Sequence, residues 1–229
     1  KKIGIAVSGG GDSMALLHLL ARCAEQTGYP IEAVTVDHGL RPESAQEAAS
    51  VAAACGHANI PHTILKWEGW DGHGNLSAAA RDARYAMMAD WAKGRGIGGI
   101  VLGHTCDDVA ETFLMRLARK AGVDGLASMD VEFKKNGIRW ARPLWRQHRS
   151  ELRDYLRRHD VRWIEDPTND DTAYERVRVR QALQVLEPLG IDVETLKHVS
   201  FSMWETRAAL EHYTHQEAEQ REVQQGGDI

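Results

Sequence analysis

Short apolar runs alternate with longer amphipathic segments through the first 130 residues, and this alternation narrows the choice of fold more than any other feature. Strands are expected at 3–7, 31–38, 62–67 and 98–105, and helices at 12–28, 41–56, 76–96 and 107–122. Helical crossovers between successive strands make the strands parallel and cover both faces of the sheet. Nearly all-apolar strands fit such a sheet. We therefore expect an α/β fold with an open, doubly wound parallel sheet.

The second half of the chain departs from this alternation. One further strand is expected within 137–144, and a helix is expected at 150–160 with Ser150 as its N-cap. A turn-rich, charged segment then leads into another helix, and residues 192–223 are polar and compatible with a helix. The sequence predicts one domain over 1–190, followed over 191–229 by a helical extension or the start of a linker to a missing C-terminal domain.

Composition argues against several classes of protein. No apolar run approaches the roughly 20 residues of a membrane-spanning helix. No secretory leader is visible, although the chain begins without Met, which leaves a preceding leader open. The three cysteines, Cys23, Cys55 and Cys106, form no Cys-x-x-Cys pair. A disulfide framework, an iron–sulfur cluster and a structural zinc site are therefore not expected, and a reducing cytoplasm is the simplest setting.

Charge is unevenly distributed along the chain. The net charge is −5, whereas thirteen Lys/Arg stand against eight Asp/Glu between Lys134 and Arg180. That stretch carries about +5 and the remainder about −10. The asymmetry favours a surface that faces a polyanion, with an ordinary solvated helix face as the alternative.

Three consecutive glycines follow the first expected strand. They belong to a six-residue segment made of Ser8, Gly9, Gly10, Gly11, Asp12 and Ser13. Open α/β sheets bind ligands beyond the carboxyl ends of their strands, and glycines let backbone N–H groups converge on an anion. A helix N-terminus at Asp12 and Ser13 also favours phosphate. We expect these six residues to bind phosphate; a plain glycine turn with Ser13 as helix cap is the alternative.

The surroundings of the glycines match neither common phosphate-binding pattern. The Walker pattern and the dinucleotide-binding pattern are both absent, and no lysine follows the glycines. A metal ion held partly by Asp12 is a reasonable substitute for that lysine.

Several ordered segments within residues 3–190 resemble known proteins. SGGGDS (8–13) resembles the PP-loop of the N-type ATP pyrophosphatases. Further segments are similar to those of one member family, the tRNA(Ile)-lysidine synthetases: TVDHGLRPESAQEA (35–48), NLSAAARDARY (75–85), GHTCDDVAETFLMRLARKAGVDGLASM (103–129), RPL (142–144) and EDPTNDDTAYERVRVR (165–180). This chain departs from the family pattern at Val109, usually Gln, at Lys120 and Ala121, commonly Gly-Ser, and at Val177, usually Asn.

The resemblance implies an activity. ATP and Mg²⁺ adenylate C2 of the wobble cytidine of tRNA(Ile) with a CAU anticodon, pyrophosphate leaves, and L-lysine then displaces AMP. It also implies a HUP-type fold resembling the adenine nucleotide alpha hydrolases, with residues 1–190 as the N-type ATP pyrophosphatase catalytic domain. A cytoplasmic ligase without a membrane partner is expected, and the oligomeric state stays open between a monomer and a homodimer.

Two acidic residues are the strongest catalytic candidates. Asp108 and Glu111 are three residues apart on an expected helix and share one face. The resemblance implies that they hold the substrate lysine, and carboxylates there can help to deprotonate its amine. His104 lies just before them at the end of a strand. The alternatives are a solvated helix N-terminus for the acids and a core histidine for His104.

Arginines are expected to stabilise charge on the phosphates or on cytosine O2. Arg84, Arg176 and Arg178 are the candidates, Arg81 is a less favoured one, and surface ion pairs are the alternative. His38 ends the second expected strand, and its position there suggests the nucleotide-facing edge of the sheet; a residue that only caps the strand is the alternative. Trp67, Trp70 and Trp91 are expected to pack in the core or on the surface.

Three other functions stay open at this point. A tRNA-thiolating enzyme with the same loop would normally need paired cysteines, and a glutamine-dependent amidating ligase would need an amidotransferase domain. A nucleotide-binding module that senses ATP without catalysis is the non-enzyme alternative.

Overall fold

The computed structural model describes residues 1–39, 42–68, 70, 73–127, 129–165 and 171–224. The chain divides into two compact units, which are described separately. Unit 1 comprises Lys1–Thr105 and Val131–Asn169, and unit 2 comprises Cys106–Asp130 and Asp170–Ile229. The domain boundary expected at residue 190 stays a prediction.

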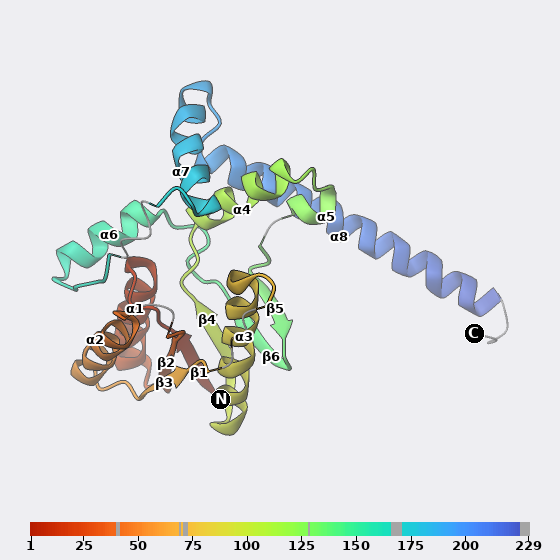
Figure 1. Ribbon diagram of the computed structural model, residues 1–229. Helices are drawn as coiled ribbons and strands as arrows, with labels where there is room; N and C mark the ends of the chain where they lie inside the picture. The colour runs from red at the N-terminus through yellow and green to blue at the C-terminus, as the bar shows by residue number, and fades with distance from the viewer. Residues whose placement is uncertain (40–41, 69, 71–72, 128, 166–170, 225–229) are drawn as a thin grey trace. The chain divides into compact units, whose positions relative to one another are not determined.

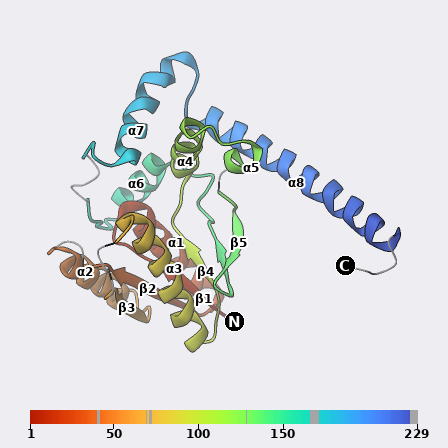
Figure 2. The same cartoon turned by 45° about the vertical axis from the view of Figure 1, so that its right-hand side comes forward.

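Unit 1 is built on a six-stranded sheet with the order β3-β2-β1-β4-β6-β5 (Figures 1 and 2). All neighbouring strands are parallel except β5 and β6, which form an antiparallel pair at one edge. The strands are β1 Lys2–Ala6, β2 Ile31–Asp37, β3 His62–Lys66, β4 Ile97–Leu102, β5 Glu132–Lys135 and β6 Ile138–Ala141. The chain winds outward from β1 in one direction to β2 and in the other to β4, so a topological switch point lies between β1 and β4.

Helices cover both faces of this sheet, as Figure 1 shows. They are α1 Gly11–Thr27, α2 Ser44–His57, α3 Leu76–Gly94 and α6 Arg149–Arg158. One apolar core includes Ile5 of β1, Leu16 of α1, Val51 of α2 and Leu156 of α6. A second core joins α3 to the opposite face, and Trp91 belongs to it. The predicted doubly wound α/β fold is confirmed, with the expected strand at 137–144 present as β6.

Unit 1 differs from the sequence-based expectations at two places. The strand β5 was not predicted; it pairs with β6 through a turn at Asn136 and Gly137, whose φ angles are 52° and 77°. Asn-Gly is the residue pair that such two-residue hairpins favour. Ser150 is not an N-cap, because α6 already begins at Arg149. Its N-cap is His148, whose backbone N–H donates to Glu151 Oε2 at 2.9 Å.

Unit 2 is helical. It contains α4 Cys106–Ala118, α5 Val123–Leu126, α7 Glu175–Leu186, a short 3-10 helix Glu187–Leu189 and α8 Val193–Gln224. Phe113 of α4 and Leu196 of α8 lie in its apolar core. The expected polar helix over 192–223 is present as α8, and the helix expected at 107–122 ends earlier, at Ala118.

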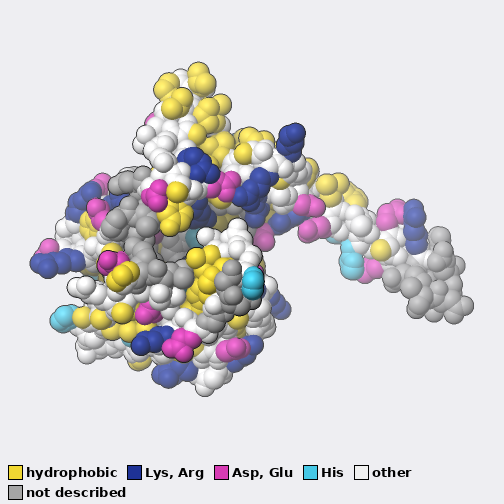
Figure 3. Space-filling view, in the orientation of Figure 1, with side chains coloured by type: hydrophobic (Ala, Val, Ile, Leu, Met, Phe, Trp, Pro, Cys, Tyr) yellow, Lys and Arg dark blue, Asp and Glu magenta, His cyan; other side chains and the backbone are white. Residues whose placement is uncertain are grey.

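The surface of unit 2 carries exposed apolar side chains. Val185 and Leu189 are both exposed, and Figure 3 shows hydrophobic side chains gathered over the end of α7. Every described side chain of α8 from 209 to 221 is exposed. Within the described part of the chain, no helix combines the length and apolar character that crossing a membrane requires.

Candidate active site

The loop between β1 and α1 carries the predicted phosphate-binding residues. α1 begins at Gly11, and Gly10 rather than Ser13 is its N-cap. The Ser13 hydroxyl donates to the Gly10 carbonyl at 2.9 Å and accepts the backbone N–H of Ser8 at 3.2 Å. Met14 N–H makes a helical bond to Gly10 O at 3.0 Å, so the N–H groups of the preceding turn have no intrahelical acceptor. The serines close the loop and leave a helix N-terminus suited to an anion.

Two glycines permit close backbone packing around this loop. Gly9 has a φ of +92°, and a Cβ there would lie 2.6 Å from Cδ1 of Ile164. Gly103 follows β4 directly, and a Cβ on it would lie 2.9 Å from the carbonyl oxygen of Asp12 and 3.0 Å from Cα of Ser13. The end of β4 therefore lies against the first turn of α1, at the switch point of the sheet.

An arginine from α6 holds the carboxylate of the loop. Asp12 Oδ2 lies 3.1 Å from Nε of Arg149, and the two side chains are 20% and 18% exposed. Arg149 places a full positive charge beside a loop that contains no basic residue of its own. Sequence reasoning missed this residue.

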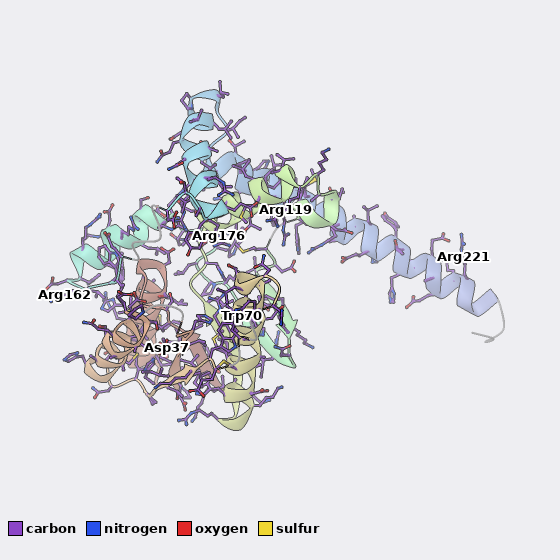
Figure 4. The ribbon with its side chains drawn as sticks, viewed as in Figure 1. Asp37, Trp70, Arg119, Arg162, Arg176 and Arg221 are labelled. Carbon is purple, nitrogen blue, oxygen red and sulfur yellow. The ribbon has the colours of Figure 1, made fainter. Side chains whose placement is uncertain are left out.

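His38 and Arg84 interact where β2 ends. Burial lowers the pKa of His38, the nearby Arg84 cation lowers it further, and the Asp37 carboxylate opposes both. The imidazole is therefore mainly neutral near pH 7. Its ring meets that of Trp67 edge-on at 5.7 Å between centroids, and the Trp67 and Trp70 centroids are 6.4 Å apart. Figure 4 labels Asp37 and Trp70 in this unit.

His104 is oriented by a buried arginine. Arg142 Nε donates to Nδ1 of His104 at 3.2 Å. The same guanidinium lies 4.3 Å from the centroid of the Phe133 ring. Because Nδ1 accepts the hydrogen bond from Arg142, a neutral His104 carries its proton on Nε2. Arg142 is a second site residue that the sequence reading did not single out for chemistry.

Unit 2 holds the predicted acids, and α7 supplies their counter-charges. Glu111 Oε1 lies 2.7 Å from Nε of Arg180, and the Glu111 side chain is only 1% exposed. Arg176, labelled in Figure 4 near the start of α7, lies 3.4 Å from Asp108 Oδ1 and 4.0 Å from Glu111 Oε2. The acids are buried and paired, so the alternative of a solvated helix N-terminus is wrong.

Arg178 of α7 does not join Arg176 and Arg180 at the acids. Arg178 donates to the carbonyl oxygens of Thr172 at 2.6 Å and Ala173 at 2.9 Å, so it holds the turn that precedes the helix. Arg176 and Arg180 are four residues apart and share a face, which is a signal that could have identified Arg180 from the sequence. The departures Val109 and Val177 are both buried.

The two buried thiols are poorly suited to chemistry. Burial raises the pKa of Cys55 to about 11 and, together with the adjacent Asp107 carboxylate, that of Cys106 to about 12. A thiolate is the reactive form of cysteine, so neither buried cysteine is primed as a nucleophile.

The predicted site residues thus fall into two groups, each inside one unit. Unit 1 holds the loop residues with His38, Arg84 and His104, and unit 2 holds Asp108, Glu111 and Arg176. Thr105, Cys106 and Asp107 separate His104 from Asp108 along the chain.

Curated relatives match this chain over most of its length. The tRNA(Ile)-lysidine synthase of Ruegeria pomeroyi is 48% identical over 229 residues, which are 100% of this chain and 55% of that protein. The enzyme of the same name from Wolbachia pipientis is 41% identical over 216 residues, 93% of this chain and 50% of that protein. This chain spans about half the length of these relatives.

A solved structure shares the fold. The U34-tRNA thiolase NcsA from Methanococcus maripaludis superposes with a TM-score of 0.74, covering 90% of this chain and 70% of that one, at 17% sequence identity. Residues 1–187 match the family model of the PP-loop domain. That match includes the loop, the sheet and all the site residues described above, and this chain is a member of the PP-loop domain family.

Proposed function

We propose that this chain attaches L-lysine to C2 of the wobble cytidine of a tRNA(Ile) with a CAU anticodon, in a reaction driven by ATP in the cytoplasm. ATP adenylates the cytosine oxygen and releases pyrophosphate, and the ε-amine of lysine then displaces AMP. The names of the relatives support this substrate. The observation that carries the proposal is the buried acid pair, Asp108 and Glu111, in a chain of the PP-loop family.

The loop supplies the phosphate-binding part of this reaction. N–H groups in the first turn of α1 and the helix dipole hold the departing phosphates while the cytosine oxygen attacks the α-phosphate. Asp12 fits a Mg²⁺ site, because magnesium binds through one or two carboxylates together with phosphate oxygens, and Asp12 already pairs with a cation at 3.1 Å. Bound Mg²⁺ would neutralise charge on the phosphates.

The acids on α4 supply the lysine-binding part. An ammonium group has three N–H donors and needs carboxylate acceptors when it is withdrawn from water. Asp108 and Glu111 offer such acceptors on one face of α4 and are negatively charged partners for it. A carboxylate in this position can also take the proton that the amine must lose before it attacks.

The remaining predicted residues stabilise charge in this proposal. Arg176 is a fixed cation next to both acids, and Arg84 is one next to a neutral His38. Negative charge that develops on phosphate or cytosine oxygens is stabilised by such preorganised cations. His104, which is fixed by Arg142, offers its Nε2–H as a neutral donor for the same purpose.

Mass spectrometry of the tRNA tests the proposal directly. A CAU-anticodon tRNA is incubated with the 229-residue chain, ATP, Mg²⁺ and L-lysine, and its anticodon fragment is weighed. The expected product is heavier by one lysine less one water, with pyrophosphate release that needs the tRNA. Incubation without lysine is the control, in which the lysine adduct is absent.

Other outcomes identify the rival functions. A sulfur-for-oxygen mass change in the presence of a sulfur donor would indicate thiolation, and pyrophosphate release without tRNA would indicate a small-molecule ligase. ATP binding without turnover would indicate a sensor. Binding of tRNA should weaken steeply with salt if the basic stretch 134–180 meets its phosphates, whereas a flat response would remove that stretch from the interface.

A further inference from the structure

The PP-loop of this chain contains no lysine or arginine between Ser8 and Ser13. Its helix N-terminus contributes only about half an elementary charge. The phosphates that it is proposed to hold carry several negative charges, and the Walker-type loop meets them with a lysine of its own. A side-chain cation from another part of unit 1, in addition to the metal ion expected at Asp12, would supply the charge that the loop lacks.

α6 brings a cation to the loop. Its first residue, Arg149, has Nε 3.1 Å from Oδ2 of Asp12, although 137 positions separate the two residues in the chain. Leu152 and Leu156 anchor the helix, because both are buried in the core that α6 shares with α1. The position of Arg149 is thus fixed by packing and does not depend on the ion pair alone.

A second arginine of α6 lies on the same side of the helix. Arg153 is four residues after Arg149, and its Cγ lies 3.8 Å from the position that a Cβ on Gly11 would occupy. Its Nε is buried and has no hydrogen-bond partner among the residues that the structure describes. By contrast, Arg157 pairs with Asp154 at 2.6 Å and is largely exposed. The guanidinium of Arg149 and the side-chain stem of Arg153 therefore both lie against the first turn of α1.

We propose that Arg149 binds the departing pyrophosphate and takes the place of the missing loop lysine, with Arg153 as the second cationic contact. The proposal rests on the proposed function only in requiring that ATP binds at this loop. Arg149 neutralises Asp12 in the free protein and transfers its N–H donors to a phosphate oxygen when the ligand binds. Asp12 is then released for the cation that accompanies the phosphates.

The test compares ligands with and without the outer phosphates. Calorimetric titrations of the 229-residue chain with inorganic pyrophosphate and with AMP, both in Mg²⁺, are made on wild type, Arg149→Ala, Arg149→Lys and the control Arg158→Ala. Arg158 has the same charge on the same helix and is exposed. Loss of one charge-assisted contact should weaken pyrophosphate binding about 10- to 100-fold in Arg149→Ala and leave AMP binding unchanged.

The two other variants sharpen this result. Arg158→Ala should bind pyrophosphate as wild type does, and Arg149→Lys should recover only part of the affinity, because a lysine offers a point charge without the guanidinium fork. Circular dichroism and urea unfolding of each variant report whether the fold is intact. Equal pyrophosphate affinity in Arg149→Ala and Arg158→Ala would overturn the proposal.

In this proposal Asp12 competes with pyrophosphate for Arg149, and a variant of Asp12 tests that competition independently. Without Mg²⁺, Asp12→Asn should strengthen pyrophosphate binding, and the gain should be smaller when Arg149 is already alanine. Equal gains in both backgrounds would contradict the exchange of partners.

The outcomes separate this proposal from the proposed function. Pyrophosphate binding that depends on Arg149 in a chain that makes no lysine adduct would leave this inference standing and refute the lysidine activity. Formation of the lysine adduct by a chain whose pyrophosphate affinity is unchanged in Arg149→Ala would support the lysidine activity and refute this inference. A wild-type chain that binds no pyrophosphate would contradict both.

Discussion

Replacement of Gly103 by alanine tests the geometry of the loop with a single methyl group. A Cβ at this position would lie 2.9 Å from the carbonyl oxygen of Asp12 and 3.0 Å from both its carbonyl carbon and Cα of Ser13. All three atoms are backbone, so no side chain can rotate away. An ordinary contact begins near 3.4 Å, and the first turn of α1 must therefore move by about half an ångström.

This displacement sets the expected size of the effect. Overpacking of this kind typically destabilises a protein by about 1–3 kcal/mol, which urea unfolding measures. Misplacement of the first turn should also weaken ATP binding about tenfold or more, because its N–H groups no longer converge on the phosphates. The matched control is Gly94→Ala at the end of α3, where a new Cβ meets nothing within 4 Å. If Gly103→Ala behaves like this control in both measurements, the close approach of β4 to the loop is refuted.

Three further measurements address the acids and the histidines. Asp108→Asn should slow lysine transfer about 100-fold or more while pyrophosphate release falls much less, and an equal loss of both steps would argue against a lysine-binding role. Arg180→Ala should destabilise the chain by about 1–3 kcal/mol, because it removes the 2.7 Å partner of a buried carboxylate. Adding Glu111→Gln should recover part of that loss in urea unfolding, and strictly additive effects would count against the pair. Burial lowers the folded-state pKa of His18, His38 and His62. The unfolding free energy should therefore decline as the pH falls below 6.5, because the unfolded chain then binds more protons than the folded chain. A profile without this decline would show that these shifts are absent.

The sheet and helices of unit 1 could be predicted because buried segments have recognisable local patterns of apolar residues. The central strands are covered on both faces, so they read as apolar runs, and Gly28 ends α1 with a φ of 68°, where its N–H bonds to Ala24 O. β5 has no such apolar run, since Glu132 and its neighbours form a mostly polar edge strand whose hydrogen-bonded partner is β6. The Asn-Gly turn between the two strands was the available signal.

The site was predictable only where a local pattern carried it. Glycines located the loop, and the three-residue spacing of Asp108 and Glu111 placed them on one face of α4. Arg149 was missed because its partner lies 137 residues away, and no local pattern reports such a distance. Arg142 was missed for the same reason, 38 residues from His104. Tertiary packing, not propensity, decides which of many arginines meets which acid.

Each unit keeps a carboxylate of its proposed site paired with its own arginine. Glu111 is almost fully buried, and loss of Arg180, the nearer of its two arginines, would destabilise unit 2 by about 1–3 kcal/mol, so Arg180 is needed before any substrate arrives. Asp12 and Arg149 have the same relation in unit 1, at the partly exposed N-terminus of α1. An incoming cation must then share the carboxylate with the arginine or displace it, which lowers its affinity. The arginines thus stabilise the free protein and weaken cation binding at the same atoms, so stability and substrate affinity at these two sites are opposed.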